Sequence, residues 1–291
     1  MKKEYLYAGV SIFFWSTTAT VAKLLLGTLN SMQIMAVSSL FAFAFLFFAN
    51  LIKGSLKKLR EYKLSDYLWL FGLGMLGIFA YHLFLYIGID KMDASQAFII
   101  NYLWPIMTVV FACIILKEKL TPRKAIAIVL SFVGVVAVTS NGNLLSIGHE
   151  TLVGSVYCVI AAVAYGLFSV LDKKKGYDKS IAMMFYYFFT CAVSFVYVFL
   201  ANDTFTLTLG ETAGMLWNGI FTTAIAYTSW AMALDGGDTA KISNLAYITP
   251  FLSLVWTTFI LKEEFKPWSV VGLVIIVLGI FIQLKDKKKV G

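Results

Sequence analysis

The stretch that decides the fold is 101-NYLWPIMTVVFACIILKE-118, because the chain carries a second copy of it at 246-AYITPFLSLVWTTFILKE-263. The match extends without a gap from residues 90–136 to residues 235–281, at a constant offset of 145 residues, and 12 of its 47 positions are identical. Prolines, charged residues and a glycine align in register, which apolar composition alone would not produce. An internal repeat in a hydrophobic chain indicates secondary transporters, whose sites lie where two repeats meet.

Composition places the chain in a membrane. Hydrophobic residues make up 60% of its 291 residues and charged residues only 14%, and the mean hydropathy is +0.82. A soluble domain carries about 25% charged residues, so the chain has too little polar surface for that class. The composition predicts an all-α integral membrane protein.

Apolar stretches long enough to cross a hydrocarbon core of about 30 Å as helices recur along the whole chain. We expect ten of them, five in a first repeat over residues 1–141 and five in a second repeat over residues 150–285, followed by a basic tail at residues 286–291. Their approximate ranges are 5–26, 32–52, 66–88, 94–116, 122–140, 151–172, 180–201, 211–234, 239–261 and 267–284.

Lysine and arginine placement sets the expected orientation, because cytoplasmic loops retain these residues. With the N-terminus inside, 20 of the 24 basic residues lie on the inner side, and only Lys91, Lys262 and Lys266 lie outside. Both termini are therefore expected in the cytoplasm. Because each repeat has an odd number of helices, the two repeats are expected to be inverted, an arrangement that permits alternating access.

Two predicted helices carry a proline near the middle, Pro105 in the fourth span and Pro250 in the ninth. Proline removes a backbone hydrogen bond and leaves a carbonyl free, and interrupted helices at matching places in two halves indicate a transporter site. Both prolines are expected to act as helix breaks or hinges. The polar and aromatic residues beside the breaks are substrate-binding candidates: Asn101, Tyr102, Trp104, Asn244 and Tyr247.

Other polar groups in the predicted helices have two interpretations each. His82, beside Tyr81 in the third span, is either a packing residue or part of a pathway. Trp104 is better explained as a cavity residue, because an indole in the middle of a membrane needs a partner for its N–H. Lys23 is better explained by a side chain that extends toward the interface than by a role in the pathway. The hydroxyl run that begins at Ser16 either lines the pathway or bonds to its own helix.

Several classes of function are not supported by the sequence. Its 16 acidic residues lie at predicted helix ends and in loops, so strong proton coupling through a buried carboxylate is not expected. The three cysteines show no disulfide or metal spacing, and no catalytic, nucleotide-binding or metal-ligand motif occurs. We therefore expect no enzyme activity, no cofactor and no metal. The formal charge of +8 is explained by topology and lipid headgroups rather than by nucleic acid.

The repeat also resembles a known family. Five plus five helices, a proline in the fourth helix of each half, and a closing Leu-Lys-Glu followed by Pro122 or Pro267 resemble the EamA-type branch of the drug/metabolite transporter superfamily. Within that branch, the Tyr81-His82 pair and the stretch 101-NYLWP-105 resemble the bacterial aromatic amino acid exporters. This resemblance implies a central aromatic cavity lined by Tyr81, His82, Tyr102, Trp104 and, in the sixth helix, Tyr165.

The resemblance implies export or facilitated diffusion of aromatic and other hydrophobic amino acids, or of related metabolites. A substrate cation lying on Trp104 or Tyr102 would gain roughly 0.5–2 kcal/mol. Two alternatives stay open, namely an EamA-type carrier for drugs or another small metabolite, and a membrane scaffold or sensor without flux. The expected partners are the small-molecule substrate and membrane lipids, and the expected state is a monomer in a bacterial inner membrane.

Overall fold

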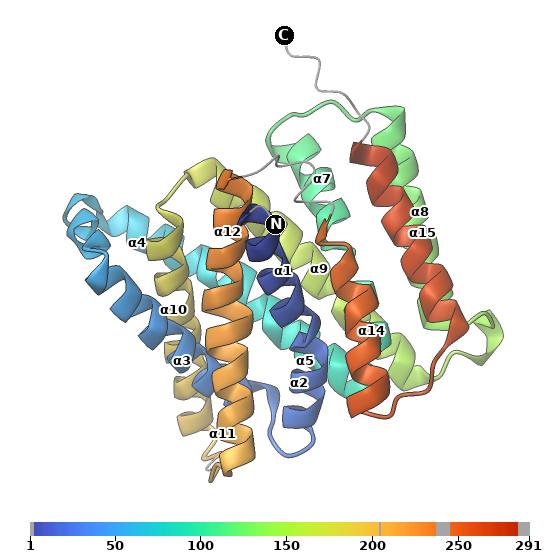
Figure 1. The fold of residues 1–291 in the computed structure, drawn as a ribbon, viewed down its shortest axis with the longest axis horizontal. Helices are drawn as coiled ribbons and strands as arrows, with labels where there is room; N and C mark the ends of the chain where they lie inside the picture. Colours follow the sequence, from blue (N-terminus) through green and yellow to red (C-terminus); the bar gives the residue numbers. More distant parts are fainter. Residues whose placement is uncertain (1–2, 204, 237–244, 285–291) are drawn as a thin grey trace.

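The computed structural model describes residues 3–203, 205–236 and 245–284. Over these residues the chain is helical, with no strand (Figure 1). By length and composition, seven helical segments within Lys3–Leu200 are sufficient to cross a membrane, and Ile248–Ile260 and Pro267–Ile282 are shorter apolar helices. The structure agrees with the predicted all-α membrane fold.

The first half of the chain contains both short and long helices. Helix α1 (Lys3–Ser16) and α2 (Thr18–Leu26) form the first span, which is interrupted at Thr17. The remaining elements are α3 (Ser31–Ile52), the 3₁₀ segment η1 (Ser55–Glu61), α4 (Leu64–Gly74), the π-helical segment η2 (Met75–Ala80), α5 (Tyr81–Lys91), α6 (Ala94–Asn101), α7 (Trp104–Ile115) and α8 (Pro122–Ser140).

The second half repeats much of this order. After the 3₁₀ segment η3 (Leu144–Ser146) come α9 (His149–Lys175), α10 (Lys179–Leu200), α11 (Leu209–Leu216), the π-helical segment η4 (Trp217–Ile225), α12 (Ala226–Gly236), α14 (Ile248–Ile260) and α15 (Pro267–Leu284). Helices α6 and α7 are separated at Tyr102 and Leu103, directly before Pro105. Helix α14 begins at Ile248, with Pro250 in its first turn.

Helices of the two halves pack on one another in a reciprocal pattern. Helix α3 packs against α10, and α8 lies beside α15 at one edge of the molecule (Figure 1). Helix α1 packs on α12, whereas α5 packs on α9. The first span of each half thus contacts the third span of the other half. This packing brings the middle of the third spans close to the helix break of the fourth span, at the centre of the molecule.

Glycines permit the closest of these approaches. A Cβ atom on Gly134 of α8 would lie 2.7 Å from the carbonyl oxygen of Gly272 of α15, and one on Gly272 would lie 2.6 Å from that of Gly134. Small residues allow helix backbones to approach closely in membranes. The two fifth helices therefore pack backbone against backbone.

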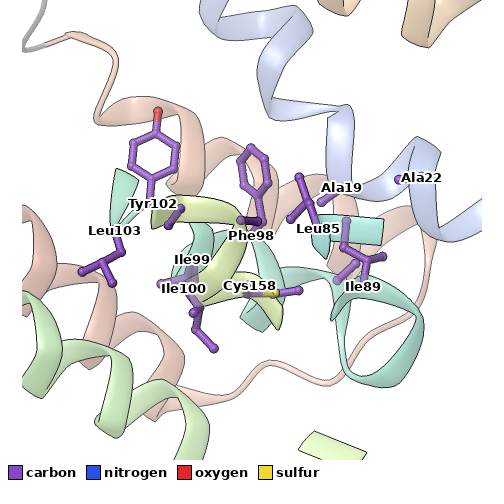
Figure 2. Close-up of a cluster of buried hydrophobic side chains, with 14 of the residues drawn as sticks. Ala19, Ala22, Leu85, Ile89, Phe98, Ile99, Ile100, Tyr102, Leu103 and Cys158 are labelled. Atoms are coloured by element: carbon purple, nitrogen blue, oxygen red, sulfur yellow. The ribbon is translucent and has the colours of Figure 1, made fainter. Parts of the chain in front are cut away.

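The core surrounds the helix break. Figure 2 shows Phe98 and Tyr102 pointing to one side of this segment, while Ile100 and Leu103 point away from them. The side chains of Ile100 and Leu103 are fully buried. The break is therefore held by apolar packing on one side, which leaves its other side to form a site.

Candidate functional site

A cavity of about 160 Å³ lies where the two halves meet. A water molecule needs roughly 10–15 Å³ on the same measure, so the cavity has room for on the order of a dozen non-hydrogen atoms. Ten of its lining residues have aromatic rings: Trp15, Tyr81, His82, Phe98, Tyr102, Trp104, Tyr165, Tyr187, Tyr227 and Trp230. The others are Thr18, Asn101, Thr222, Thr223, Ala246 and Thr249. No lysine, arginine, aspartate or glutamate of the described residues lines it.

The aromatic rings form a connected wall. Tyr165 of α9 is at its centre, with its ring centroid 4.8 Å from that of Tyr81 and 5.2 Å from that of Trp104. The Tyr165 hydroxyl lies 3.2 Å from the Tyr227 hydroxyl, and the Tyr227 ring is 5.2 Å from Trp15. Edge-to-face and tilted contacts of this kind stabilise aromatic pairs. The wall therefore links α5, α7, α9, α12 and α1 around one space.

Each π-helical segment directly precedes the residues of a third span that belong to the aromatic wall. Segment η2 ends before Tyr81 and His82, and η4 ends before Ala226 and Tyr227. Shifting residues 75–80 by the repeat offset of 145 gives residues 220–225, so the π-helical turns coincide in the two repeats. Such turns are frequent at functional sites, and here each one directly precedes aromatic residues that line the cavity.

Glycines bring each π-helical region against a second-span helix of the other half. A Cβ on Gly74 would lie 3.0 Å from the Cα of Tyr186 in α10, and one on Gly219 would lie 2.3 Å from the carbonyl oxygen of Ser38 in α3. Gly74 and Gly219 are themselves related by the offset of 145. The same close approach therefore occurs twice, on the two sides of the cavity.

His82 has a defined tautomer. Its Nδ1 lies 2.8 Å from the carbonyl oxygen of Ile78, and a carbonyl can only accept, so the proton is on Nδ1. His82 lines both the central cavity and a second cavity of about 10 Å³, together with Tyr187 and Thr223. The smaller cavity has roughly the volume of one water molecule, and the buried hydroxyls of Ser38 and Thr190 beside it have no partner among the described residues.

Hydrogen bonds hold the helix break. The Asn101 Nδ2 atom donates to the Tyr81 hydroxyl at 3.0 Å. The Tyr102 hydroxyl donates to the carbonyl of Ala246 at 2.7 Å, a contact between the two halves.

Six of the predicted binding residues lie around this one cavity: Tyr81, His82, Asn101, Tyr102, Trp104 and Tyr165.

Other predicted positions lie elsewhere. The Tyr247 ring is 5.5 Å from Phe281 and does not line the cavity. Asn244 lies outside the described residues. Lys23 is half-buried, and its Nζ donates to the carbonyls of Ile89, Asp90 and Met92 at 2.6, 3.1 and 3.0 Å. It caps the end of α5.

Some hydroxyl groups of the first span bond to their own helix, whereas another lines the cavity. Ser16 and Thr17 donate to the carbonyls of Phe13 and Phe14 in their own span, whereas Thr18 lines the cavity. Trp15 and Trp230 were not predicted as cavity residues. The argument that selected Trp104, a mid-span indole that needs a partner, would also have selected Trp15, whereas Trp230 lies near the end of its expected span.

The sequence pattern of the EamA-like transporter family matches the chain twice, over residues 2–140 and 152–284. This chain belongs to the EamA-like transporter family. Members of this family are membrane transporters, and the family pattern covers nearly all of the helices that surround the cavity. The EamA chain is therefore a multi-pass membrane transporter with a small-molecule substrate.

Individual relatives agree with this assignment. An uncharacterized transporter from Clostridium kluyveri is 27% identical over 301 residues, which cover 99% of this chain and 95% of that protein. The aromatic amino acid exporter YddG from Ancylobacter novellus is 24% identical over 186 residues, 64% of each chain. One crystal structure superposes with a TM-score of 0.71 at 21% identity, over 100% of this chain and 99% of the other. That last likeness shows the fold.

Proposed function

We propose that this EamA transporter carries aromatic and other hydrophobic amino acids, or closely related metabolites, out of the cell or down their gradients. The observation that carries the proposal is the central cavity, whose wall consists of aromatic rings and neutral hydrogen-bonding groups. Rings stack on aromatic and aliphatic side chains, and their faces attract a substrate cation. The similarity to an aromatic amino acid exporter supports the same substrate class.

We further infer ten spans in two inverted repeats, with both termini in the cytoplasm and the transporter acting as a monomer in the bacterial inner membrane. The reciprocal packing of α1 on α12 and of α5 on α9 supports the repeat relationship. Two repeats of opposite direction permit the halves to rock about a central site. Pro105 and Pro250 would serve as hinges in that motion.

Polar contacts join the two halves near the N-terminus of α6. The Lys266 Nζ lies 2.5 Å from a carboxylate oxygen of Asp93 and 3.2 Å from Oε1 of Gln96. In the proposed cycle these contacts form the outer closure, and they separate when the cavity opens to the outside.

A carrier for hydrophobic drugs or another small metabolite is the second candidate. It is favoured by the same neutral aromatic wall, because stacking discriminates weakly between substrates. A nucleotide or sugar phosphate fits less well, since phosphate recognition uses arginine or lysine. No arginine or lysine among the described residues lines the cavity. Membership in a transporter family favours flux over the scaffold alternative.

Uptake of labelled phenylalanine and tryptophan into proteoliposomes tests the proposal, with and without an imposed pH gradient. Wild type should show flux, whereas Trp104→Ala and His82→Ala should reduce it at least about tenfold through loss of cavity contacts. Trp69→Ala is the matched control, because Trp69 is 45% exposed on α4 and lies outside the cavity. Absence of wild-type flux, with flux of a lipophilic drug, would move the assignment to the second candidate.

A further inference from the structure

The two proline breaks leave the backbone carbonyls of two cavity-lining residues without their usual helical donors. Residue i+4 normally donates to a helical carbonyl, but Pro105 and Pro250 have no N–H. The carbonyls affected are those of Asn101 and Ala246, and both residues line the cavity. Each break therefore presents an acceptor that a continuous helix would have used.

Among the described residues, only the second break is compensated by a tyrosine from the other half. The Ala246 carbonyl accepts from the Tyr102 hydroxyl at 2.7 Å and from the Thr249 N–H at 3.0 Å. The repeat counterpart of Tyr102 is Tyr247, at the offset of 145. Tyr247 packs on Phe281 instead, so in the described part of the chain the Asn101 carbonyl receives no equivalent hydroxyl.

The Asn101 side chain adds a second acceptor. It is 2% exposed, its Nδ2 donates to the Tyr81 hydroxyl, and its Oδ1 has no partner among the described residues. A buried polar atom without a partner is costly. Asn101, a residue that lines the cavity, therefore carries two oxygen acceptors without an identified donor among the described residues, one from the main chain and one from the side chain.

Such a pair suits a group that only donates. A primary ammonium has three N–H donors and no acceptor. The rings of Tyr102 and Trp104, with centroids 6.5 Å apart, follow Asn101 in the sequence and line the same cavity. Their faces favour a cation. We propose that Asn101 binds the primary ammonium group of the substrate through its Oδ1 and main-chain carbonyl. This rests on the proposed function only in taking the central cavity as the substrate site.

The proposal predicts that the amine contributes more to recognition than the carboxylate. No lysine or arginine among the described residues lines the cavity to pair with a carboxylate. A substrate that retains the amine and lacks the acid should therefore bind, whereas one that retains the acid and lacks the amine should bind weakly. Amino acids and aromatic amines would share the site, and N-acylated or deaminated compounds would not.

The test is binding of labelled 2-phenylethylamine and labelled 3-phenylpropionate to the purified full-length protein, by scintillation proximity. We expect the amine to bind wild type at least about tenfold more tightly than the acid, as for a hydrogen-bonded charge. Asn101→Leu should remove most of this preference. Asn101→Asp, which retains an acceptor and adds a charge, should bind the amine as well as or better than wild type.

Tyr247→Phe is the matched control, because Tyr247 is the repeat counterpart of Tyr102, packs on Phe281 and does not line the cavity. It should retain the preference for the amine. Equal binding of amine and acid to wild type, or an unchanged preference in Asn101→Leu, would overturn the inference while leaving phenylalanine flux intact. Asn101-dependent binding of the amine without phenylalanine flux would support the inference and exclude the proposed substrate. Failure of wild type to bind the amine would also overturn the inference.

Discussion

The Glu263 carboxylate caps the half-helix that begins at Ala94: Oε1 accepts from the Ala94 N–H at 2.6 Å, and Oε2 accepts from the Ser95 N–H at 3.1 Å. Glu263 belongs to the second repeat, and α6 belongs to the first. Its repeat counterpart, Glu118, pairs instead with Lys124 of its own repeat at 3.0 Å. The duplicated Lys-Glu motif is therefore used in two different ways, and one use joins the two halves.

Replacing Glu263 should weaken this junction. The substitution Glu263→Ala removes both acceptors and the negative charge at a helix N-terminus, with an expected loss of about 1–2 kcal/mol in the free energy of unfolding. Glu263→Gln should lose less, because it retains one acceptor. Thermal unfolding in detergent measures both, and Glu264→Gln, an exposed neighbour, is the control. Equal melting temperatures for Glu263→Ala and Glu264→Gln would contradict the capping role.

The hydroxyl of Tyr102 should contribute more to stability than that of its repeat counterpart. Tyr102→Phe removes the bond to the Ala246 carbonyl, which should cost about 1–3 kcal/mol because a buried acceptor loses a partner. Tyr247→Phe is the matched control, since no hydrogen bond from its hydroxyl to a described residue is found, and it should be nearly neutral. Comparison of the melting temperatures of the two variants tests this prediction. Equal destabilisation by Tyr102→Phe and Tyr247→Phe would contradict the proposed difference between the two helix breaks.

The helix break beside Pro105 and the aromatic residues around it follow from simple sequence rules. Proline cannot continue the backbone ladder, and its duplication at Pro250 indicated that the break mattered. The offset of 145 likewise indicated which helices would correspond. These features are local or repeated, and a sequence displays both kinds directly.

The remaining part of the site depends on tertiary packing. The π-helical turns before His82 and Tyr227 have no proline or other marker, and they coincide with close approaches at Gly74 and Gly219 that only the assembled bundle shows. The roles of Lys23 and Tyr247 were also set by partners distant in sequence, the end of α5 and Phe281. Periodicity cannot identify such partners, because it reports which face of a helix is apolar and not which helix meets it.

The contact between α8 and α15 should tolerate no side chain at Gly134. Gly134→Ala places a Cβ against the backbone of Gly272 and the side chain of Ile276, at 2.7 and 2.6 Å. Overpacking of this kind costs about 1–3 kcal/mol. Gly72→Ala is the control, because nothing lies within 4 Å of its added Cβ, and it should be neutral or stabilising. Thermal unfolding and the yield of folded protein report the difference, and a stable Gly134→Ala variant would refute the close approach.

Acid should weaken the N-terminus of α10 through Asp178. Its carboxylate accepts from the N–H groups of Ser180 and Ile181 at 3.1 and 3.3 Å, and it lies 2.6 Å from the Lys58 Nζ. Burial raises the pKa of Asp178, but the Lys58 side chain and these N–H groups lower it more, so its pKa lies below the usual value.

Because the folded-state pKa of Asp178 is depressed, its contribution to stability is complete above the unfolded-state pKa of about 4 and is lost as the pH falls through the folded-state value. Asp178→Asn retains an acceptor for the cap and removes the charge. At neutral pH it should lose at most about 1 kcal/mol, since the side chain of Lys58 is 57% exposed and water screens the pair. The difference in melting temperature between wild type and Asp178→Asn should therefore be constant from about pH 7 to 5 and shrink below about pH 4. Lys58→Gln should follow the same profile, and a difference that grows in acid would contradict the assigned direction of the pKa shift.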